Sequence, residues 1–171
     1  MTTNDTTERT NGAEMNETDA TDDDEATNDR PADPVTLVFM CVRNAGRSQM
    51  ATAFAERERE RRGVTGDVEI VTGGTEPADS VHDVVVEALA EVGLDVGDRT
   101  PRHVSETTLA DADFVATMGC STLELDGVTT EDWALADPGE RPIEEVREIR
   151  DEIETLVVDV FDRLETSETT L

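Results

Sequence analysis

Lysine and tyrosine are absent from this 171-residue chain, and aromatic residues make up only 3% of it. Its basic residues are 14 arginines, which face 42 aspartates and glutamates and leave a formal net charge of -28. So negative a surface repels both the phosphates of nucleic acids and anionic lipid headgroups. We therefore expect neither a nucleic acid nor a membrane as partner.

Long apolar runs and cysteines are also scarce. No segment approaches the roughly 18 apolar residues of a membrane span, and the N-terminus has neither the basic start nor the apolar stretch of a secretory signal. Two cysteines are too few for a disulfide scaffold, which indicates a reducing, cytoplasmic location. The two histidines, His82 and His103, lack partners at metal-ligand spacing, so no metal site is expected.

Acidic residues are spread along the whole chain. Residues 1–33 carry a net charge of -9 and the remaining residues -19, so an acidic tail on an ordinary domain does not explain the charge. Molar salt shortens the Debye length to about 3 Å and removes most of the repulsion between like charges. The composition therefore predicts a salt-rich cytoplasm, as in halophilic archaea.

The composition also divides the chain into a tail and one domain. Residues 1–33 contain no Val, Ile, Leu, Phe, Trp or Cys, too little apolar surface to offset the entropy of ordering. We predict a disordered acidic tail there, which either solvates the protein or binds a partner. Residues 34–165 are predicted to form a single domain, and residues 166–171 a short C-terminal tail.

Strand and helix patterns alternate along this domain. Strands are predicted at 35–40, 68–72 and 114–118, with a short one near His103. Helices are predicted at 48–62, at 81–92 with Ser80 as its cap, at 105–112 and at 143–164. Apolar strands that alternate with amphipathic helices indicate an α/β fold, a single doubly wound domain with a parallel sheet covered on both faces.

The sharpest motif lies between the first predicted strand and the first predicted helix, where the sequence reads Cys41-Val42-Arg43-Asn44-Ala45-Gly46-Arg47-Ser48. Backbone amides of such a turn converge with the unsatisfied donors of a helix N-terminus and make a cup for a tetrahedral oxyanion. We therefore predict oxyanion binding by residues 42–48. Arg47 can grip two oxygens of the anion, and the same positive field favours the Cys41 thiolate, the form that attacks.

Neighbouring residues of the motif have supporting roles. Ser48 can donate a hydrogen bond to the thiolate and assist its departure, and the Asn44 side chain can hold the shape of the loop. Arg43 either strengthens anion binding or forms an ion pair with a nearby acid. The alternative for the whole motif, a core cysteine that ends a strand, leaves Arg43 and Arg47 unexplained beside an apolar strand.

A reaction that breaks a bond to the oxyanion also needs a general acid for the departing oxygen. Asp137-Pro138, in the loop before the last helix, supplies the candidate, because an acid there could swing over the cup. The alternative is a turn opener, a common role of Asp-Pro pairs. Trp133 is interpreted as a packing anchor for this loop.

Cys-x5-Arg-Ser at the first strand–helix turn, together with a late Asp-Pro, resembles the low-molecular-weight protein tyrosine phosphatase superfamily. Arsenate reductases of the arsenic-detoxification type share its fold. The resemblance runs from about Val35 to Leu164, through the segments 72–78, 88–93, 115–120, 131–133 and 137–139. It implies a four-stranded parallel sheet of flavodoxin-like build.

Three features resemble the reductase branch of this superfamily. Gln49 stands where the phosphatases usually have proline, and Gly139 stands where they tend to carry aromatic residues that stack on a phosphotyrosine ring. Cys120 follows the strand that ends at Met118 and resembles the second cysteine of the reductases, which attacks a Cys41–arsenic adduct. A buried structural cysteine is the alternative for Cys120.

The resemblance implies an enzyme that reduces arsenate to arsenite with thiol-derived electrons and holds no bound cofactor. Ser121–Leu125 lacks the further cysteine that such reductases often carry, which excludes a three-cysteine relay. Either an external reductant opens a Cys41–Cys120 disulfide, or an external thiol attacks directly; thioredoxin, glutaredoxin and a low-molecular-weight thiol are the candidates.

Two other functions remain open. A phosphatase would hydrolyse phosphotyrosine or small phosphate esters through a phosphocysteine, using the same residues except Cys120. A non-enzymatic module would bind oxyanions or sense redox state, and Asp137 would be idle in it.

Overall fold

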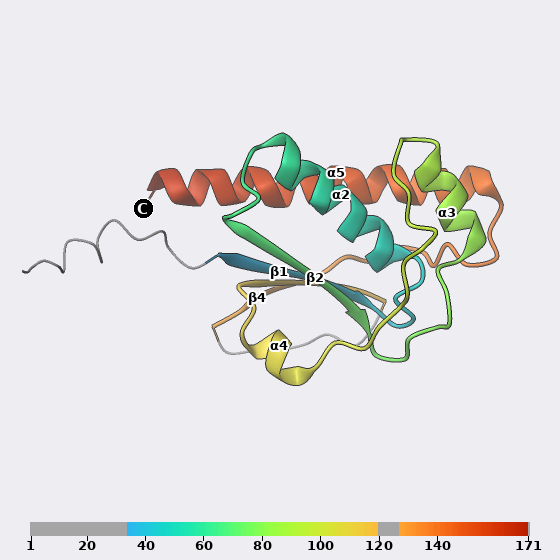
Figure 1. Cartoon of the computed structure of the whole chain (residues 1–171), viewed down its shortest axis with the longest axis horizontal. Helices are drawn as coiled ribbons and strands as arrows, with labels where there is room; N and C mark the ends of the chain where they lie inside the picture. The colour runs from blue at the N-terminus through green and yellow to red at the C-terminus, as the bar shows by residue number, and fades with distance from the viewer. Residues whose placement is uncertain (1–33, 120–126, 171) are drawn as a thin grey trace, which may run out of the picture. The chain divides into compact units, whose positions relative to one another are not determined.

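The computed structural model describes residues 34–119 and 127–170, with side chains to residue 166. The predicted acidic tail and Cys120 lie outside these residues. The described strands form one sheet in the order β2-β1-β3-β4, with every neighbouring pair parallel (Figure 1). They are β1 (Val35–Cys41), β2 (Val68–Gly74), β3 (Phe114–Met118) and β4 (Thr129–Asp132). The predicted four-stranded parallel sheet is confirmed.

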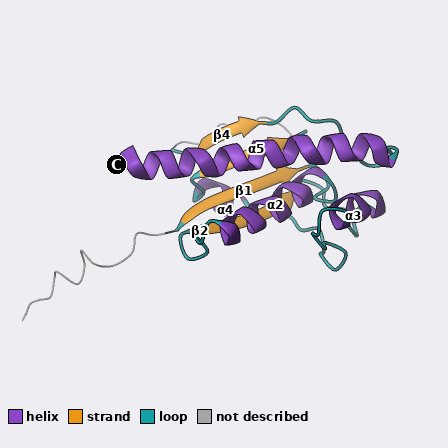
Figure 2. Cartoon of the chain, turned by 90° about the horizontal axis from the view of Figure 1, so that it is seen from above, coloured by secondary structure: helices purple, strands orange, loops and turns teal. Residues whose placement is uncertain are grey.

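Helices cover both faces of this sheet, as predicted. They are α2 (Arg47–Arg61), α3 (Asp83–Ala90), α4 (Glu106–Ala110) and α5 (Ile143–Thr170). Helices α2 and α5 lie side by side on one face, with α3 packed against α5, and the short α4 lies on the opposite face (Figures 1 and 2). Among the described residues, no helix is long and apolar enough to cross a membrane.

Strand β1 separates two hydrophobic cores. Leu37 and Phe39 face the larger core with α2, α3 and α5, whereas Val38 and Met40 face the smaller core, which Leu109 of α4 helps to close. Successive residues of a strand point to opposite faces, so a strand buried on both faces is apolar at every position. This is why the continuous run of β1 was readable from sequence.

Two elements differ from the prediction. Strand β4 was not predicted, because its residues Thr129–Asp132 are polar and partly exposed; it pairs only with β3, at the edge of the sheet. Helix α3 begins at Asp83 with His82 at its N-cap, so the predicted Ser80 cap is wrong. The reason is that the His82 amide donates to the Ala45 carbonyl (2.9 Å) and Val81 is buried, which holds the chain extended until Asp83.

The last helix is longer than the predicted 143–164. Helix α5 continues to Thr170, into the segment predicted as a C-terminal tail. Arg62, at the end of α2, donates to Asp162 (2.9 Å) and Glu165 (2.8 Å) and so ties the added turns to the domain. The domain boundary at 165 remains a prediction.

An ion-pair cluster joins α5 to the end of α3, and it predicts how stability depends on pH. Hydrogen bonds from Arg147 first, and from Arg150, lower the pKa of Glu91 from its ordinary 4.5 to about 2. A carboxylate whose pKa falls on folding contributes stability above about pH 4.5, and this contribution is lost between pH 4.5 and 2. Glu91→Gln therefore lowers the free energy of unfolding at pH 7, and the difference from wild type shrinks as pH falls through that window. Urea unfolding across this pH range measures it, with the exposed Glu148→Gln as control; a difference that stays constant would contradict the expectation.

Candidate active site

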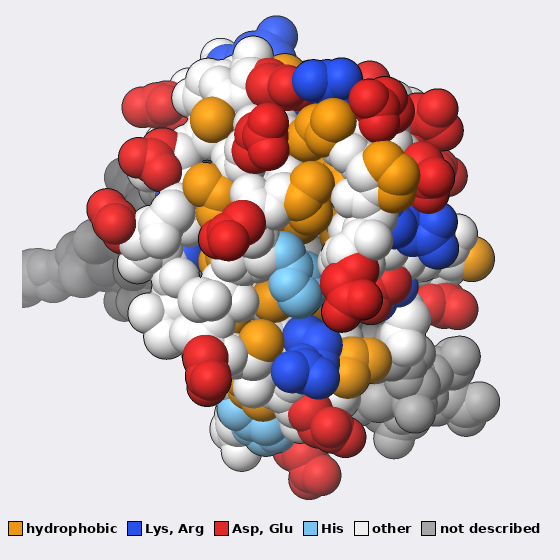
Figure 3. All heavy atoms as spheres, turned by 90° about the vertical axis from the view of Figure 1, so that its right-hand side faces the viewer, with side chains coloured by type: hydrophobic (Ala, Val, Ile, Leu, Met, Phe, Trp, Pro, Cys, Tyr) orange, Lys and Arg blue, Asp and Glu red, His pale blue; other side chains and the backbone are white. Residues whose placement is uncertain are grey.

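The predicted motif lies at the carboxyl end of the sheet. Cys41 is the last residue of β1, and α2 begins at Arg47, so residues 42–46 form the loop between them. Figure 3 shows this end of the molecule, where arginine and histidine side chains lie among acidic ones. Ligands of open parallel sheets bind at this edge, because the loops that follow the strands meet there.

The Cys41 sulfur is buried, with the residue only 2% exposed, yet polar groups surround it. The Ser48 hydroxyl lies 3.0 Å from Sγ, and the Asn44 amide donates to Sγ at 3.2 Å. Donors of this kind stabilise a thiolate more than a thiol. An inert core cysteine would instead be surrounded by apolar atoms, so the geometry favours a reactive Cys41.

Asn44 holds the loop in shape, as its side chain was predicted to do. It adopts a left-handed backbone conformation with φ of 53°. Its Nδ2 donates to the hydroxyls of Ser48 (2.7 Å) and Thr72 (2.8 Å), and its Oδ1 accepts from the Arg102 amide (3.0 Å) and Gln49 Nε2 (3.1 Å). The buried side chain thus ties the loop to β2, to α2 and to the segment after α3.

The carbonyl groups of the loop are bound on its outer side. The carbonyls of Cys41, Val42, Arg43 and Ala45 accept hydrogen bonds from the amides of Thr75, Glu76, Ala78 and His82. No described group accepts from the amides of Arg43, Ala45, Gly46 and Arg47. Helix α2 also has no side-chain cap and no acidic residue in its first turn. Its positive N-terminal end and these amides are therefore free to bind an anion.

Arg47 is mostly buried, at 9% exposure, and only one of its guanidinium donors forms a hydrogen bond with a described residue. Its Nη1 donates to the Leu135 carbonyl at 2.9 Å, and its Nη2 lies 3.9 Å from Asp137 Oδ2. Its Nε is buried and has no hydrogen-bond partner among the described residues. Because leaving a buried charged donor unpaired is costly, this Nε indicates a place for an oxyanion.

The Asp137 loop lies against the motif from the other side. Pro138 packs so closely on Gly46 that a Cβ at Gly46 would lie 2.8 Å from Pro138 Cγ. Asp137 itself is exposed, and its Oδ1 accepts from the Gly139 amide at 2.9 Å. The carboxylate is therefore open to solvent and lies close to the guanidinium of Arg47.

Trp133 anchors this loop, as predicted. Its buried indole lies with its centroid 5.9 Å from the ring of Phe39 and 6.4 Å from that of Phe114. The Leu135 amide donates to the Trp133 carbonyl at 2.8 Å, which orients the Leu135 carbonyl that Arg47 contacts. The packing of Trp133 in the core thus fixes the backbone segment whose Leu135 carbonyl binds the Arg47 guanidinium.

Two residues of the site, His82 and Gln49, were not predicted. His82 was interpreted as an isolated residue, whereas a Cβ at Gly139 would lie 3.0 Å from His82 Nε2, so the ring lies against the Asp137 loop. Gln49 served only to distinguish the reductases from the phosphatases, whereas its Nε2 donates to both the backbone and the side-chain oxygen of Asn44. The position of Gln49 on the first turn of α2 could have revealed this contact; the packing of His82 had no local signal.

Two of the predicted residues are left open. Arg43 is exposed and forms no ion pair with any described carboxylate, which removes the described acids as its partners. Cys120 lies outside the described residues, so its distance from Cys41 is not part of the geometry. The roles assigned to the site residues remain predictions.

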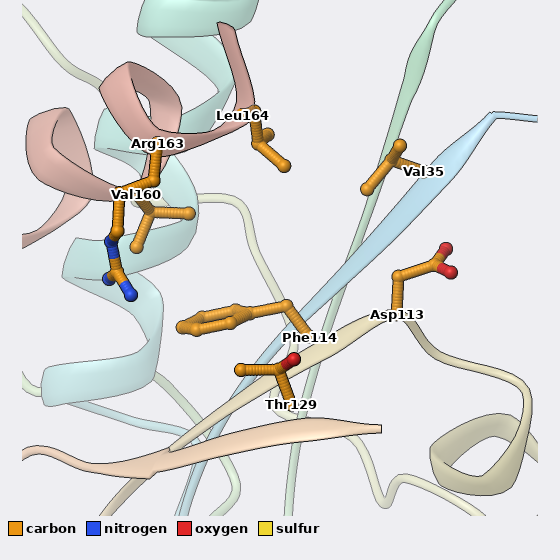
Figure 4. Close-up of a pocket in the computed structure, with 7 residues that line it drawn as sticks. All are labelled: Val35, Asp113, Phe114, Thr129, Val160, Arg163 and Leu164. Carbon is orange, nitrogen blue, oxygen red and sulfur yellow. The ribbon is translucent and has the colours of Figure 1, made fainter. Parts of the chain in front are cut away.

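Another cavity, of about 240 Å³, lies far from the motif (Figure 4). It opens at the amino ends of β1, β3 and β4, where Phe114 lies across from Val160 and Leu164 of α5. Cys41 is at the opposite ends of these strands, so this cavity does not belong to the candidate site. Within the described part of the chain, no group of His, Cys, Asp and Glu side chains could hold a metal ion.

The glycine after β3 gives a sharp test of the Arg47 position. Gly119 has φ of 85°, and a Cβ there would collide with the Arg47 guanidinium. Gly119→Ala should therefore displace Arg47 and raise the dissociation constant for a tetrahedral oxyanion such as sulfate by about 10- to 100-fold, the value of one charge-assisted contact. Calorimetric titration measures this, with Gly127→Ala as matched control, because Gly127 also has positive φ (77°) but open space around it. Equal effects of the two variants would show that backbone strain alone is responsible.

Known proteins resemble the chain over most of its length. Residues 36–169 match the family described as low molecular weight phosphotyrosine protein phosphatase. A Halobacterium salinarum protein named "Putative arsenate reductase" is 64% identical over 126 residues, which make up 72% of this chain and 89% of that protein. Arsenate reductase 2 of Staphylococcus epidermidis is 32% identical over 132 residues, 73% of this chain and 95% of that protein.

Solved structures agree with these sequence matches. The thioredoxin-dependent arsenate reductase of Corynebacterium glutamicum superposes with a TM-score of 0.66 at 30% sequence identity, over 83% of this chain and 67% of that chain. The long family match, the similar relatives and the shared fold lead to one conclusion. The chain belongs to the low molecular weight phosphotyrosine protein phosphatase family.

Proposed function

We propose that this protein is an arsenate reductase that uses thiol-derived electrons, with Cys41 as its nucleophile. The observation that carries the proposal is the arrangement around Cys41 Sγ. The sulfur accepts from the Asn44 amide, the adjoining loop amides are free, and Arg47 Nε is buried without a described partner. The names of the relatives in Halobacterium, Staphylococcus and Corynebacterium support the choice of arsenate.

The first step joins sulfur to arsenic. The Cys41 thiolate attacks arsenate, which the loop amides and Arg47 hold, and an arsenate oxygen leaves as water after it accepts a proton from Asp137. Arsenic remains As(V) in the resulting Cys41–arsenic adduct. The amides and the guanidinium stabilise the charge that develops on the other oxygens.

The second step transfers two electrons. A thiolate, from Cys120 or from an external reductant, attacks Cys41 Sγ; the S–S bond forms, the S–As bond breaks, and its electron pair stays on arsenic. Arsenic leaves as arsenite, As(III), and two thiols have become one disulfide. An external thiol then reduces this disulfide and restores the Cys41 thiolate.

Burial of the aromatic residues favours arsenate over phosphotyrosine. The chain contains four phenylalanines, one tryptophan and no tyrosine. All five rings lie in the core, at exposures of 6% or less. No Phe or Trp side chain is therefore available to stack on the ring of a phosphotyrosine, and the loop beside Asp137 carries Gly139 instead.

A second candidate function follows from the family itself. Phosphate and arsenate have the same tetrahedral shape and charge, so the cup that holds one also holds the other. Hydrolysis of small phosphate esters would use Cys41, Arg47 and Asp137 and would not need a second thiol. The composition supports a salt-rich cytoplasm as the place of action. The similarity to arsenate reductases supports an external thiol, not a bound cofactor, as the reductant.

Arsenite formation is the direct test of the proposal. Purified protein in high salt receives arsenate with dithiothreitol, and separately p-nitrophenyl phosphate, and arsenite and nitrophenol are measured. We expect arsenite from wild type and none from Cys41→Ser. Arg47→Lys should lower the rate of arsenite formation by about 100- to 1000-fold, because an ammonium group cannot replace the bidentate hydrogen bonds of the guanidinium. Arg61→Lys, exposed on α2, is the control.

The same assay separates the alternatives. Loss of arsenite in Cys120→Ser with dithiothreitol present would assign the second thiol to Cys120, whereas retained activity would assign it to the external thiol. Ester hydrolysis without any arsenite would overturn the reductase in favour of the phosphatase. Absence of both activities from wild type would leave the oxyanion-binding module.

A further inference from the structure

Ion pairs occupy most of the arginines of the described chain, but two exposed ones are exceptions. Arg43, Arg59 and Arg102 have no described carboxylate within ion-pair distance, and of these Arg59 donates to the Val68 carbonyl at 3.2 Å. Arg43 and Arg102 are exposed. With acids three times as numerous as arginines, a surface guanidinium without such a partner is unusual in this chain, and it marks a position that can take an anion from outside.

Arg43 belongs to the loop that follows the reactive cysteine, and its side chain is exposed. It lies two residues after Cys41, and its own carbonyl is fixed by the Ala78 amide at 2.9 Å. Both histidines are attached to the same region, since the His82 amide donates to Ala45 and His103 forms a bridge with Gly74. On this end of the molecule an arginine side chain lies between histidine side chains, and acidic side chains lie around them (Figure 3).

Arsenate itself leaves nothing for the Arg43 side chain to bind. Its oxygens have the loop amides and Arg47 as partners, and unlike a phosphate ester it has no substituent that extends beyond the cup. Under the proposed function, the next molecule that must reach Cys41 is the thiol that reduces the adduct. An exposed guanidinium on the same loop can bind a carboxylate by two parallel hydrogen bonds.

We propose, on the basis of the proposed function, that Arg43 binds a carboxylate of the electron donor, which is a carboxylate-bearing low-molecular-weight thiol. The described surface supports a small donor over a redox protein. Val92 is the one large apolar side chain that is exposed among the described residues, so an apolar anchor for a docked protein is missing there. A single guanidinium suffices for a small carboxylate.

Electrons and atoms balance in the step that this site serves. The thiolate sulfur of the donor attacks Cys41 Sγ, the S–S bond forms, and the S–As bond breaks with its electron pair on arsenic. Arsenite leaves, and a mixed disulfide remains on Cys41. A second molecule of the donor attacks the donor sulfur of this mixed disulfide, which releases the Cys41 thiolate and the symmetric disulfide.

Thiol–disulfide exchange tests the site without arsenic. In the Cys120→Ser background, the Cys41 thiolate reacts with dithiodiglycolate, which carries two carboxylates, or with neutral bis(2-hydroxyethyl) disulfide, and mass spectrometry follows the mixed disulfide. The ratio of the two rates cancels any change that a variant makes in chemistry common to both reagents. We expect Arg43→Gln to lower this ratio by about twofold to fivefold, as for one exposed carboxylate contact.

Arg61→Gln is the charge control, since it removes the same charge from an exposed arginine near the end of α2 that lies away from the motif. The ratio should stay at the wild-type value in this variant. An equal decrease of the ratio in both variants would assign the preference to net charge and overturn the carboxylate site. An unchanged ratio in Arg43→Gln would also overturn the site.

Failure of this inference is distinguishable from failure of the proposed function. The exchange assay contains no arsenic, so absence of arsenite in the turnover assay overturns the reductase, whereas an unchanged exchange ratio overturns the carboxylate site. A turnover arm compares mercaptoacetate with a thioredoxin as donor. A rate loss in Arg43→Gln that is confined to thioredoxin would overturn the assignment to a small thiol.

Discussion

The hydrogen bonds of the Asn44 side chain are the constraint on which the site depends. Peptide groups of a short loop prefer no single direction, and the amides become an anion-binding cup only if the carbonyls point away. Asn44 fixes this by bonding Ser48 and Thr72 with its amide nitrogen and Arg102 and Gln49 with its oxygen. Because the backbone amide of the same residue also donates a hydrogen bond to Cys41 Sγ, Asn44 determines both the shape of the loop and the environment of the sulfur.

Acidic composition and site chemistry constrain one another in this protein. A net charge of -28 opposes the approach of any anion, yet the proposed substrate is an anion. Carboxylates pair with most of the described arginines, for example Glu91 with Arg147 and Arg150. The first turn of α2, in contrast, contains no acid. The site therefore keeps a local positive field, and the distribution of charge matters more for binding than its sum.

The sequence was sufficient where the signal is local and insufficient where it depends on packing. Strand β1, the loop after Cys41 and helix α2 were predictable, because an apolar run, a dense motif and a helical stripe lie next to one another in the chain. The polar edge strand β4 has no such run and is defined only by pairing with β3. The contact of Arg47 with the Leu135 carbonyl joins residues 88 positions apart, and no spacing in the sequence reveals it.

One consequence of the Trp133 position concerns how the protein can be observed. The chain has a single tryptophan and no tyrosine, so its near-ultraviolet emission comes from one buried indole. The backbone carbonyl of the same residue accepts from the Leu135 amide, and the Leu135 carbonyl in turn accepts from the Arg47 guanidinium. Occupation of the cup and opening of the adjoining loop should each change the emission of Trp133, which makes the protein its own optical probe and removes the need for a label.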